Sequence, residues 1–96
     1  MIKLKGDKYV SIIAVQLAVT DYDKWRVGFD KYHSLRSLAG ITASSVYRNA
    51  DNSNEILVWN ETTDVNKSRE AISGPDVQKA MQESGVIGPP KIHVMP

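Results

Sequence analysis

The sequence predicts an α+β fold, in which an antiparallel sheet carries its helices on one face. Three observations lead to this prediction. Segments rich in β-branched residues alternate with segments of helical periodicity. Turn residues separate two consecutive strand segments, which therefore pair as a hairpin. The strand segments are apolar on both of their sides, whereas two helices can cover only one side.

The chain has 96 residues, enough for one domain over residues 1–96 with a core of modest size. Its hydrophobic fraction of 42% and charged fraction of 24% are ordinary for a soluble globular protein. A net charge of +1 and scattered lysines argue against a nucleic-acid or anionic-membrane partner. The sequence has no cysteine, which excludes disulfides, thiolate metal sites and a cysteine nucleophile and fits a reducing compartment.

The first strand is predicted over Tyr9–Val19, which ends at a helix cap. Lysines precede this apolar run, so that it superficially resembles a signal peptide. Ser11 and Gln16 interrupt it, no small-residue cleavage site follows, and it is too short to cross a membrane as a helix. We therefore interpret it as a strand of a cytoplasmic protein. Its odd and even positions are both largely apolar, and Gln16 needs a hydrogen-bond partner, for which a second copy of the chain is a candidate.

Residues 21–40 are predicted to form one long helix. Asp21 is a favourable N-cap, Asp23 adds negative charge to the first turn, and Gly40 suits a left-handed end. At about 100° per residue, one face of this helix carries a set of aromatic and basic side chains. The set comprises Tyr22, Trp25, Phe29, Tyr32, His33 and Arg36. Because an aromatic face that ends in an imidazole and a guanidinium is unusual for purely structural packing, we interpret it as a possible site wall.

The second half of the chain repeats the alternation. Strands are predicted over 41–49 and 55–61, and the turn cluster Asp51–Asn54 joins them as a hairpin. Asp64 caps a second helix, which breaks at Gly74 and resumes over Pro75–Ser84. A last short strand is predicted over Lys91–Met95. The resulting order, β-α-β-β-α-β, is the ferredoxin-like arrangement.

Both helices of this arrangement lie on the same face of the sheet. The opposite face would remain apolar and open to water, which marks an association surface. The simplest cover is a second copy of the same sheet packed by two-fold symmetry. The sequence therefore predicts a homodimer through the open sheet face.

Several short motifs between Val10 and Val94 carry a resemblance to a known superfamily. They are Asp-Tyr-Asp-Lys-Trp at 21–25, Phe-Asp at 29–30, Arg36, Ala39-Gly40, Val46-Tyr47-Arg48, Gly74-Pro75, Ala80-Met81 and 85–90. With this topology, the chain resembles the dimeric α/β-barrel superfamily, which includes antibiotic-biosynthesis-monooxygenase-like proteins and small polyketide cyclases. The resemblance implies a ligand pocket between the sheet and the long helix, and some members work without a cofactor. Such proteins often carry a histidine one position earlier, where this chain has Tyr32.

His33 and Arg36 are the candidate catalytic residues. Spaced by three positions, they share a helical face. His33 has an unperturbed pKa of about 6.5 and is suited to moving a proton, while Arg36 can hold a carboxylate, phenolate or enolate. The structural alternative places His33 at the helix edge and pairs Arg36 with an acid.

The candidate substrate-binding residues are aromatic: Trp25, Phe29, Tyr32, Tyr47 and Trp59. Such side chains line slots for planar ligands, but they also fill small cores. Trp59 has two alternatives, a pocket wall or the dimer interface. His93 on the last strand either reaches the pocket or the partner, or is a partly exposed edge residue. Asp30 either orients His33 or is a solvated acid.

Two functions follow from these residues. The first is a cofactor-free cyclase or monooxygenase acting on an aromatic or polyketide-like molecule. The second is a non-catalytic ligand-binding or assembly protein, which a filled pocket would favour, because small-molecule sites usually measure about 300 Å³ or more. A subunit that only dimerises another protein is a weaker third. The sequence contains no phosphate loop, nucleophile elbow or metal-ligand spacing, and nothing indicates haem or flavin.

Overall fold

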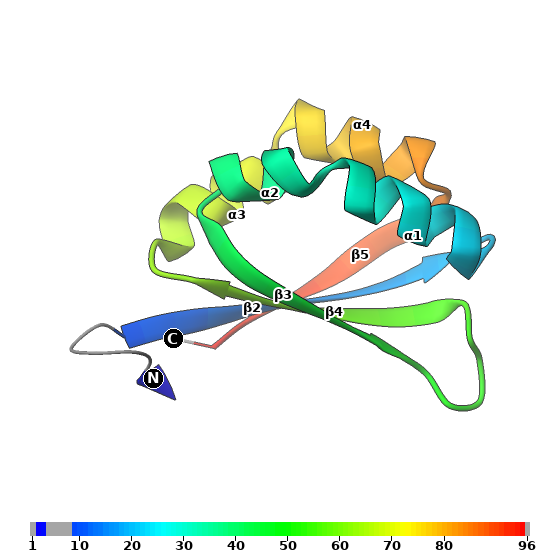
Figure 1. Ribbon diagram of the computed structural model, residues 1–96, viewed down its shortest axis with the longest axis horizontal. Coiled ribbons are helices and arrows are strands. Elements are labelled where there is room, and N and C mark those ends of the chain that lie inside the picture. The colour runs from blue at the N-terminus through cyan, green and yellow to red at the C-terminus, as the bar shows by residue number, and fades with distance from the viewer. Residues whose placement is uncertain (1, 4–8, 96) are drawn as a thin grey trace.

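The computed structural model describes residues 2–3 and 9–95. A sheet forms one layer, and all the helices lie across one of its faces (Figure 1). The order of strands and helices confirms the predicted α+β, ferredoxin-like fold.

The central strand is β2 (Tyr9–Val19), which pairs antiparallel with β4 (Glu55–Thr62) and β5 (Val86–Met95). Strand β3 (Ile41–Arg48) pairs with the outer side of β4 as the predicted hairpin. The short β1 (Ile2–Lys3), which the sequence pattern did not predict, pairs with the beginning of β2. Strand β5 begins at Val86 rather than Lys91, because a register shift opposite residues 16–18 accommodates the segment around Gly88.

The predicted long helix is two helices, α1 (Tyr22–Lys31) and α2 (His33–Leu38), separated at Tyr32. The backbone of Tyr32 has φ −93° and ψ 24°, outside the helical region. The predicted caps are confirmed at both ends of the pair. Asp21 accepts from the amides of Asp23 and Lys24 at 2.9 and 3.3 Å, and Gly40 has a φ of +83°.

The second pair of helices is α3 (Val65–Ser73) and α4 (Pro75–Glu83). Asp64 caps α3 by accepting from the amide of Lys67 at 3.0 Å. Two buried hydroxyls join α3 to the end of α2, because Ser68 Oγ donates to the carbonyl of Ala39 at 2.7 Å and lies 2.8 Å from Thr62 Oγ1. The helices are thus tied to one another at this end of the layer.

Alternate residues of the strands face opposite sides of the sheet. Under the helices, apolar side chains form the core, comprising Ile13, Val15, Leu17, Val19, Trp25, Ile56, Val58 and Ile72. The other face carries Ile12, Ala14 and Gln16 of β2, as the strand alternation predicted. Register places Trp59 between Ala14 and Ser45 on that same open face. Figure 1 shows no described element covering it.

Candidate functional site

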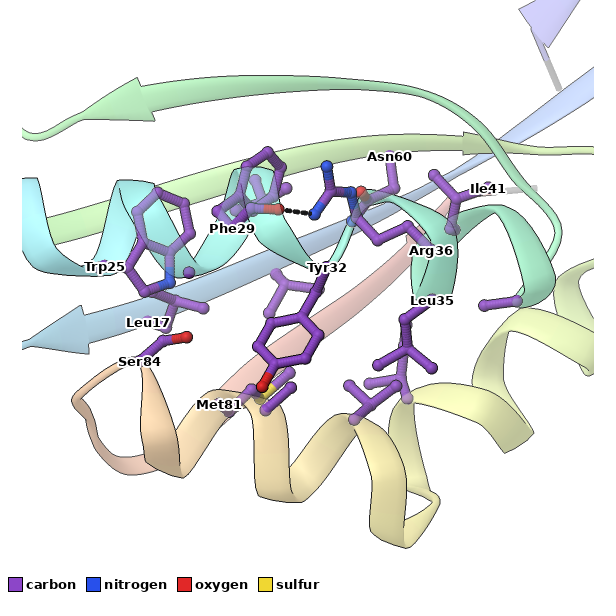
Figure 2. A pocket seen from close by; sticks show the side chains of 17 residues that line it. Leu17, Trp25, Phe29, Tyr32, Leu35, Arg36, Ile41, Asn60, Met81 and Ser84 are labelled. Atoms are coloured by element: carbon purple, nitrogen blue, oxygen red, sulfur yellow. Dashed lines mark hydrogen bonds between the residues drawn. The ribbon is translucent and has the colours of Figure 1, made fainter.

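A cavity lies between the helices and the covered face of the sheet. Its volume is about 110 Å³. Helices α1 and α2 form one wall, α3 and α4 a second, and strands β2, β3 and β4 the floor. Figure 2 shows the labelled side chains converging on this space from both helix pairs and the sheet. The lining is almost entirely apolar, and its polar groups are Tyr32, Arg36, Asn60 and Ser84.

Four of the predicted site residues line the cavity: Trp25, Phe29, Tyr32 and Arg36. Trp25 is buried, and its ring centroid lies 4.9 Å from that of Phe29. The two rings therefore form a continuous aromatic wall along α1. They narrow the space between helix and sheet without filling it.

The structure places three other predicted site residues outside the cavity. His33 is exposed and is not a lining residue, because it lies at the edge of the predicted helix face, as the structural alternative had it. Tyr47 and Trp59 point to the open face of the sheet. Tyr47 lines a separate depression of about 370 Å³ together with Gln16 and Leu57. Of the two alternatives for Trp59, the pocket wall is therefore excluded.

Arg36 is half-buried and lies against the aromatic wall. Its guanidinium carbon sits 3.6 Å from the centroid of the Phe29 ring, and Nη1 donates to the carbonyl of Phe29 (Figure 2). That carbonyl belongs to the last turn of α1, where carbonyls lack intrahelical partners. Burial lowers the pKa of Arg36, and Asp30 partly offsets this effect. An arginine still remains protonated at physiological pH.

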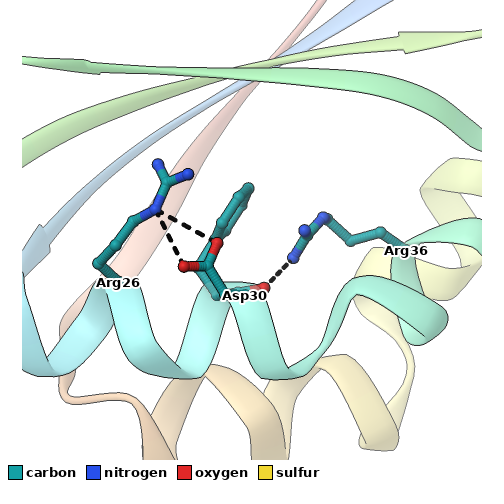
Figure 3. Close-up of polar contacts among 4 residues, drawn as sticks. Arg26, Asp30 and Arg36 are labelled. Carbon is teal, nitrogen blue, oxygen red and sulfur yellow. Dashed lines mark hydrogen bonds and ion pairs between the residues drawn. The ribbon is translucent and has the colours of Figure 1, made fainter.

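Asp30 does not form an ion pair with Arg36. It pairs instead with Arg26 one turn earlier, at 3.3 Å between Nε and Oδ1 (Figure 3). Arg26 therefore has an acidic partner, whereas Arg36 is held by a neutral carbonyl and an aromatic ring. Asp30 is an exposed acid, which was one of its two predicted alternatives, and it does not orient His33. The predicted pairing of Arg36 with an acid is not seen among the described residues.

Asn60 is a polar lining residue that the sequence reading missed. It is buried on β4, where its Nδ2 donates to the carbonyl of Ile13 at 3.0 Å and its Oδ1 accepts from Ser44 Oγ at 2.8 Å. These contacts fix the amide orientation and use one of the two N–H groups of Nδ2. The alternation of side chains along β4 could have revealed Asn60 as a lining residue, because it shares a face with the apolar Ile56 and Val58.

Tyr32 and Ser84 bring the two helix pairs together. Tyr32 Oη donates to Glu83 Oε2 at 2.6 Å, and this hydrogen bond raises the pKa of Tyr32. Gly28 faces Ser84, and a Cβ at Gly28 would lie 2.2 Å from Ser84 Oγ. Glycine at position 28 therefore permits α1 and the end of α4 to approach over the cavity.

The described part of the chain shows no group of three or more His, Asp or Glu side chains arranged to hold a metal ion. No helix in that part is long and apolar enough to span a membrane.

Solved structures share this fold at low sequence identity. No family model matches the sequence, and no curated protein matches it. A protein proposed to be an antibiotic biosynthesis monooxygenase from Bordetella bronchiseptica aligns over 91% of this chain and 95% of its own, with a TM-score of 0.75 and 13% identity. SnoaB, a cofactor-independent oxygenase from Streptomyces nogalater, aligns over 91% and 90%, with a TM-score of 0.67 and 12% identity. The chain thus has the fold of antibiotic-biosynthesis-monooxygenase-like proteins, as the sequence resemblance implied.

Proposed function

We propose that this chain is a cofactor-free small-molecule enzyme of the cyclase or monooxygenase type, acting on an aromatic or polyketide-like molecule. One observation carries the proposal: an apolar cavity that contains a half-buried guanidinium, Arg36, and an oriented amide, Asn60. Its place beneath α1 and α2 is the one that the resemblance implied. The shared fold of SnoaB, a cofactor-independent oxygenase, adds support.

The polar pair suits reactions in which negative charge develops on a substrate oxygen. Ring closure proceeds when an enolate carbon attacks a carbonyl carbon, and the electrons move onto the carbonyl oxygen. Oxygenation of an activated phenol by O₂ likewise passes through an enolate or phenolate, with one oxygen atom retained and the other released as water. In both cases Arg36 and the second N–H of Asn60 would stabilise the oxyanion, and the apolar walls would exclude water.

The proposal does not include the acid–base role that the sequence predicted for His33. Its exposed position outside the cavity gives it no path to a ligand held beside Phe29. We therefore assign stabilisation of the oxyanion to Arg36 and Asn60. The aromatic side chains that shape the slot are Trp25, Phe29 and Tyr32.

Non-catalytic ligand binding is the second candidate, and the cavity volume favours it. A volume of about 110 Å³ is below the ordinary range of small-molecule sites, which begins at about 300 Å³. A dry engineered cavity of about 150 Å³ holds benzene, so the space suits a single ring at most. A larger substrate requires Arg36 to leave the Phe29 ring and the two helix pairs to separate.

We also propose a homodimer through the open sheet face. Leu57 and Trp59 are partly exposed on that face, which no described element covers, whereas Ile12 and Ala14 on the same face are already buried within the protomer. Burying it against a second copy would remove this apolar surface from water and give Gln16 a possible partner. Cytoplasmic location stays a prediction from the sequence.

The test follows turnover and binding separately. Phenolic and β-keto compounds of one to three rings would be incubated with the protein, while O₂ uptake and cyclised products are measured. We expect Arg36→Met and Asn60→Ala each to reduce turnover by about 10²–10³-fold, as for removal of an oxyanion donor, and His33→Ala to leave it unchanged. Binding without turnover would establish the second candidate, and absence of both would contradict the proposal.

A further inference from the structure

The charge distribution around the cavity is one-sided. Arg36 is the one lining residue, among those the structure describes, that is charged at neutral pH. No histidine, aspartate, glutamate or lysine belongs to this lining. The cavity therefore offers a positive charge, and no acidic side chain of its lining balances that charge.

The nearby acids are engaged elsewhere. Asp30 pairs with Arg26 (Figure 3). Glu83, which does not line the cavity, accepts the hydrogen bond of Tyr32. Arg36 donates to the carbonyl of Phe29, and no ion pair joins Arg36 to an acid within residues 9–95. Desolvating a half-buried guanidinium without a carboxylate partner costs free energy. A bound anion whose oxygens accept hydrogen bonds from the guanidinium would offset this cost.

We infer that the ligand of this cavity is an aromatic carboxylate, bound as the anion, with its ring against the wall of Trp25 and Phe29 and its carboxylate on the guanidinium of Arg36. The inference rests on the proposed function and narrows its substrate class. A planar carboxylate matches the fork of N–H groups on arginine. The guanidinium has five N–H donors, so Arg36 can hold this carboxylate and still donate to the oxyanion that develops on the same molecule.

Arg36 would exchange its present contacts for this ligand. The hydrogen bond to the neutral Phe29 carbonyl would give way to stronger charge-assisted bonds to the carboxylate. Because the Arg36 side chain itself lines the cavity, lifting it from the Phe29 ring also enlarges the space for a ring.

Benzoate and benzamide are the probes, because they share shape and differ in charge. Calorimetric titration at pH 7 would measure both affinities for the wild-type protein, Arg36→Met and Arg26→Met. The matched control, Arg26, also lies near the Phe29 ring, at 5.2 Å, but does not line the cavity. We expect the wild type to prefer benzoate at least tenfold, Arg36→Met to lose this preference, and Arg26→Met to keep it.

The ratio of the benzoate and benzamide affinities distinguishes a binding role of Arg36 from a purely structural one. A purely structural role of Arg36, capping the Phe29 carbonyl, would weaken both probes together and leave their ratio unchanged. Equal binding of the probes by the wild type, or a preference that survives Arg36→Met, would overturn the inference and leave the proposed function standing. If the wild type binds benzamide alone, only the inference fails. If neither probe binds and no compound of the turnover panel does, both fail.

Discussion

The two faces of the sheet are built from alternate residues of the same strands, yet they meet different surroundings. Under the helices, Val58 and Asn60 border a cavity that contains a positive charge. On the other side, Leu57 and Trp59 border a surface that no described element covers. The comparison teaches that a period of two gives one strand two different surroundings, and we propose ligand binding on one face and self-association on the other.

The largest expected effect is on the open face. Leu57→Glu should weaken the proposed dimer by at least about 100-fold, since a buried leucine contributes about 1.5–3 kcal/mol and two-fold symmetry counts it twice. Sedimentation equilibrium across a concentration series would measure this. Val27→Glu is the control, because Val27 is 70% exposed on the outer side of α1. A wild-type protein that remains monomeric at all concentrations would refute the association half of the comparison.

The next effect concerns the helices over the covered face. Gly28→Ala should lower the free energy of unfolding by about 1–2 kcal/mol, because overlap with Ser84 outweighs the better helix propensity of alanine. In a Ser84→Gly background the overlap disappears, and the same change should be neutral or stabilising. Urea unfolding of the four proteins completes the cycle. An equal loss in both backgrounds would show that the contact with Ser84 is not the cause.

The smallest effect is a pH dependence at the rim of the cavity. The hydrogen bond to Glu83 raises the pKa of Tyr32, so its contribution to stability is present below the ordinary tyrosine pKa of about 10 and is lost as pH rises through the raised value. The free energy of unfolding of Tyr32→Phe should therefore fall less than that of the wild type as the pH is raised above 9. Urea midpoints would measure it, with Tyr47→Phe, 56% exposed on the open face, as control. Identical pH profiles for Tyr32→Phe and the wild type would contradict the assignment.

The sequence was sufficient for the fold because the hydrophobic pattern and the caps agree. The alternation in β2 separates Val15 from Ala14 correctly, and Asp21, Asp64 and Gly40 mark real helix boundaries. These signals are local, so they survive without knowledge of the tertiary contacts.

The site was predicted less well, since its geometry depends on irregularities that no residue type announces. The break at Tyr32 involves neither glycine nor proline, and His33 beside it lies at the edge of the predicted face, where it is exposed. In β3 a register shift between Ile41 and Ala43 changes which alternate residues face the helices. Ile41 therefore lines the cavity while Tyr47, six residues later, points to the open face.

The two tryptophans provide the most direct test, because each reports on one face. Trp25 lines the cavity. Trp59 lies on the open face, as does Leu57, which lines the depression there. Titration with benzoate would be followed through the two indole N–H resonances in ¹⁵N-labelled protein. We predict that the Trp25 resonance shifts in a saturable manner while the Trp59 resonance stays in place. A shift of Trp59 alone would locate the ligand on the open face and contradict the account.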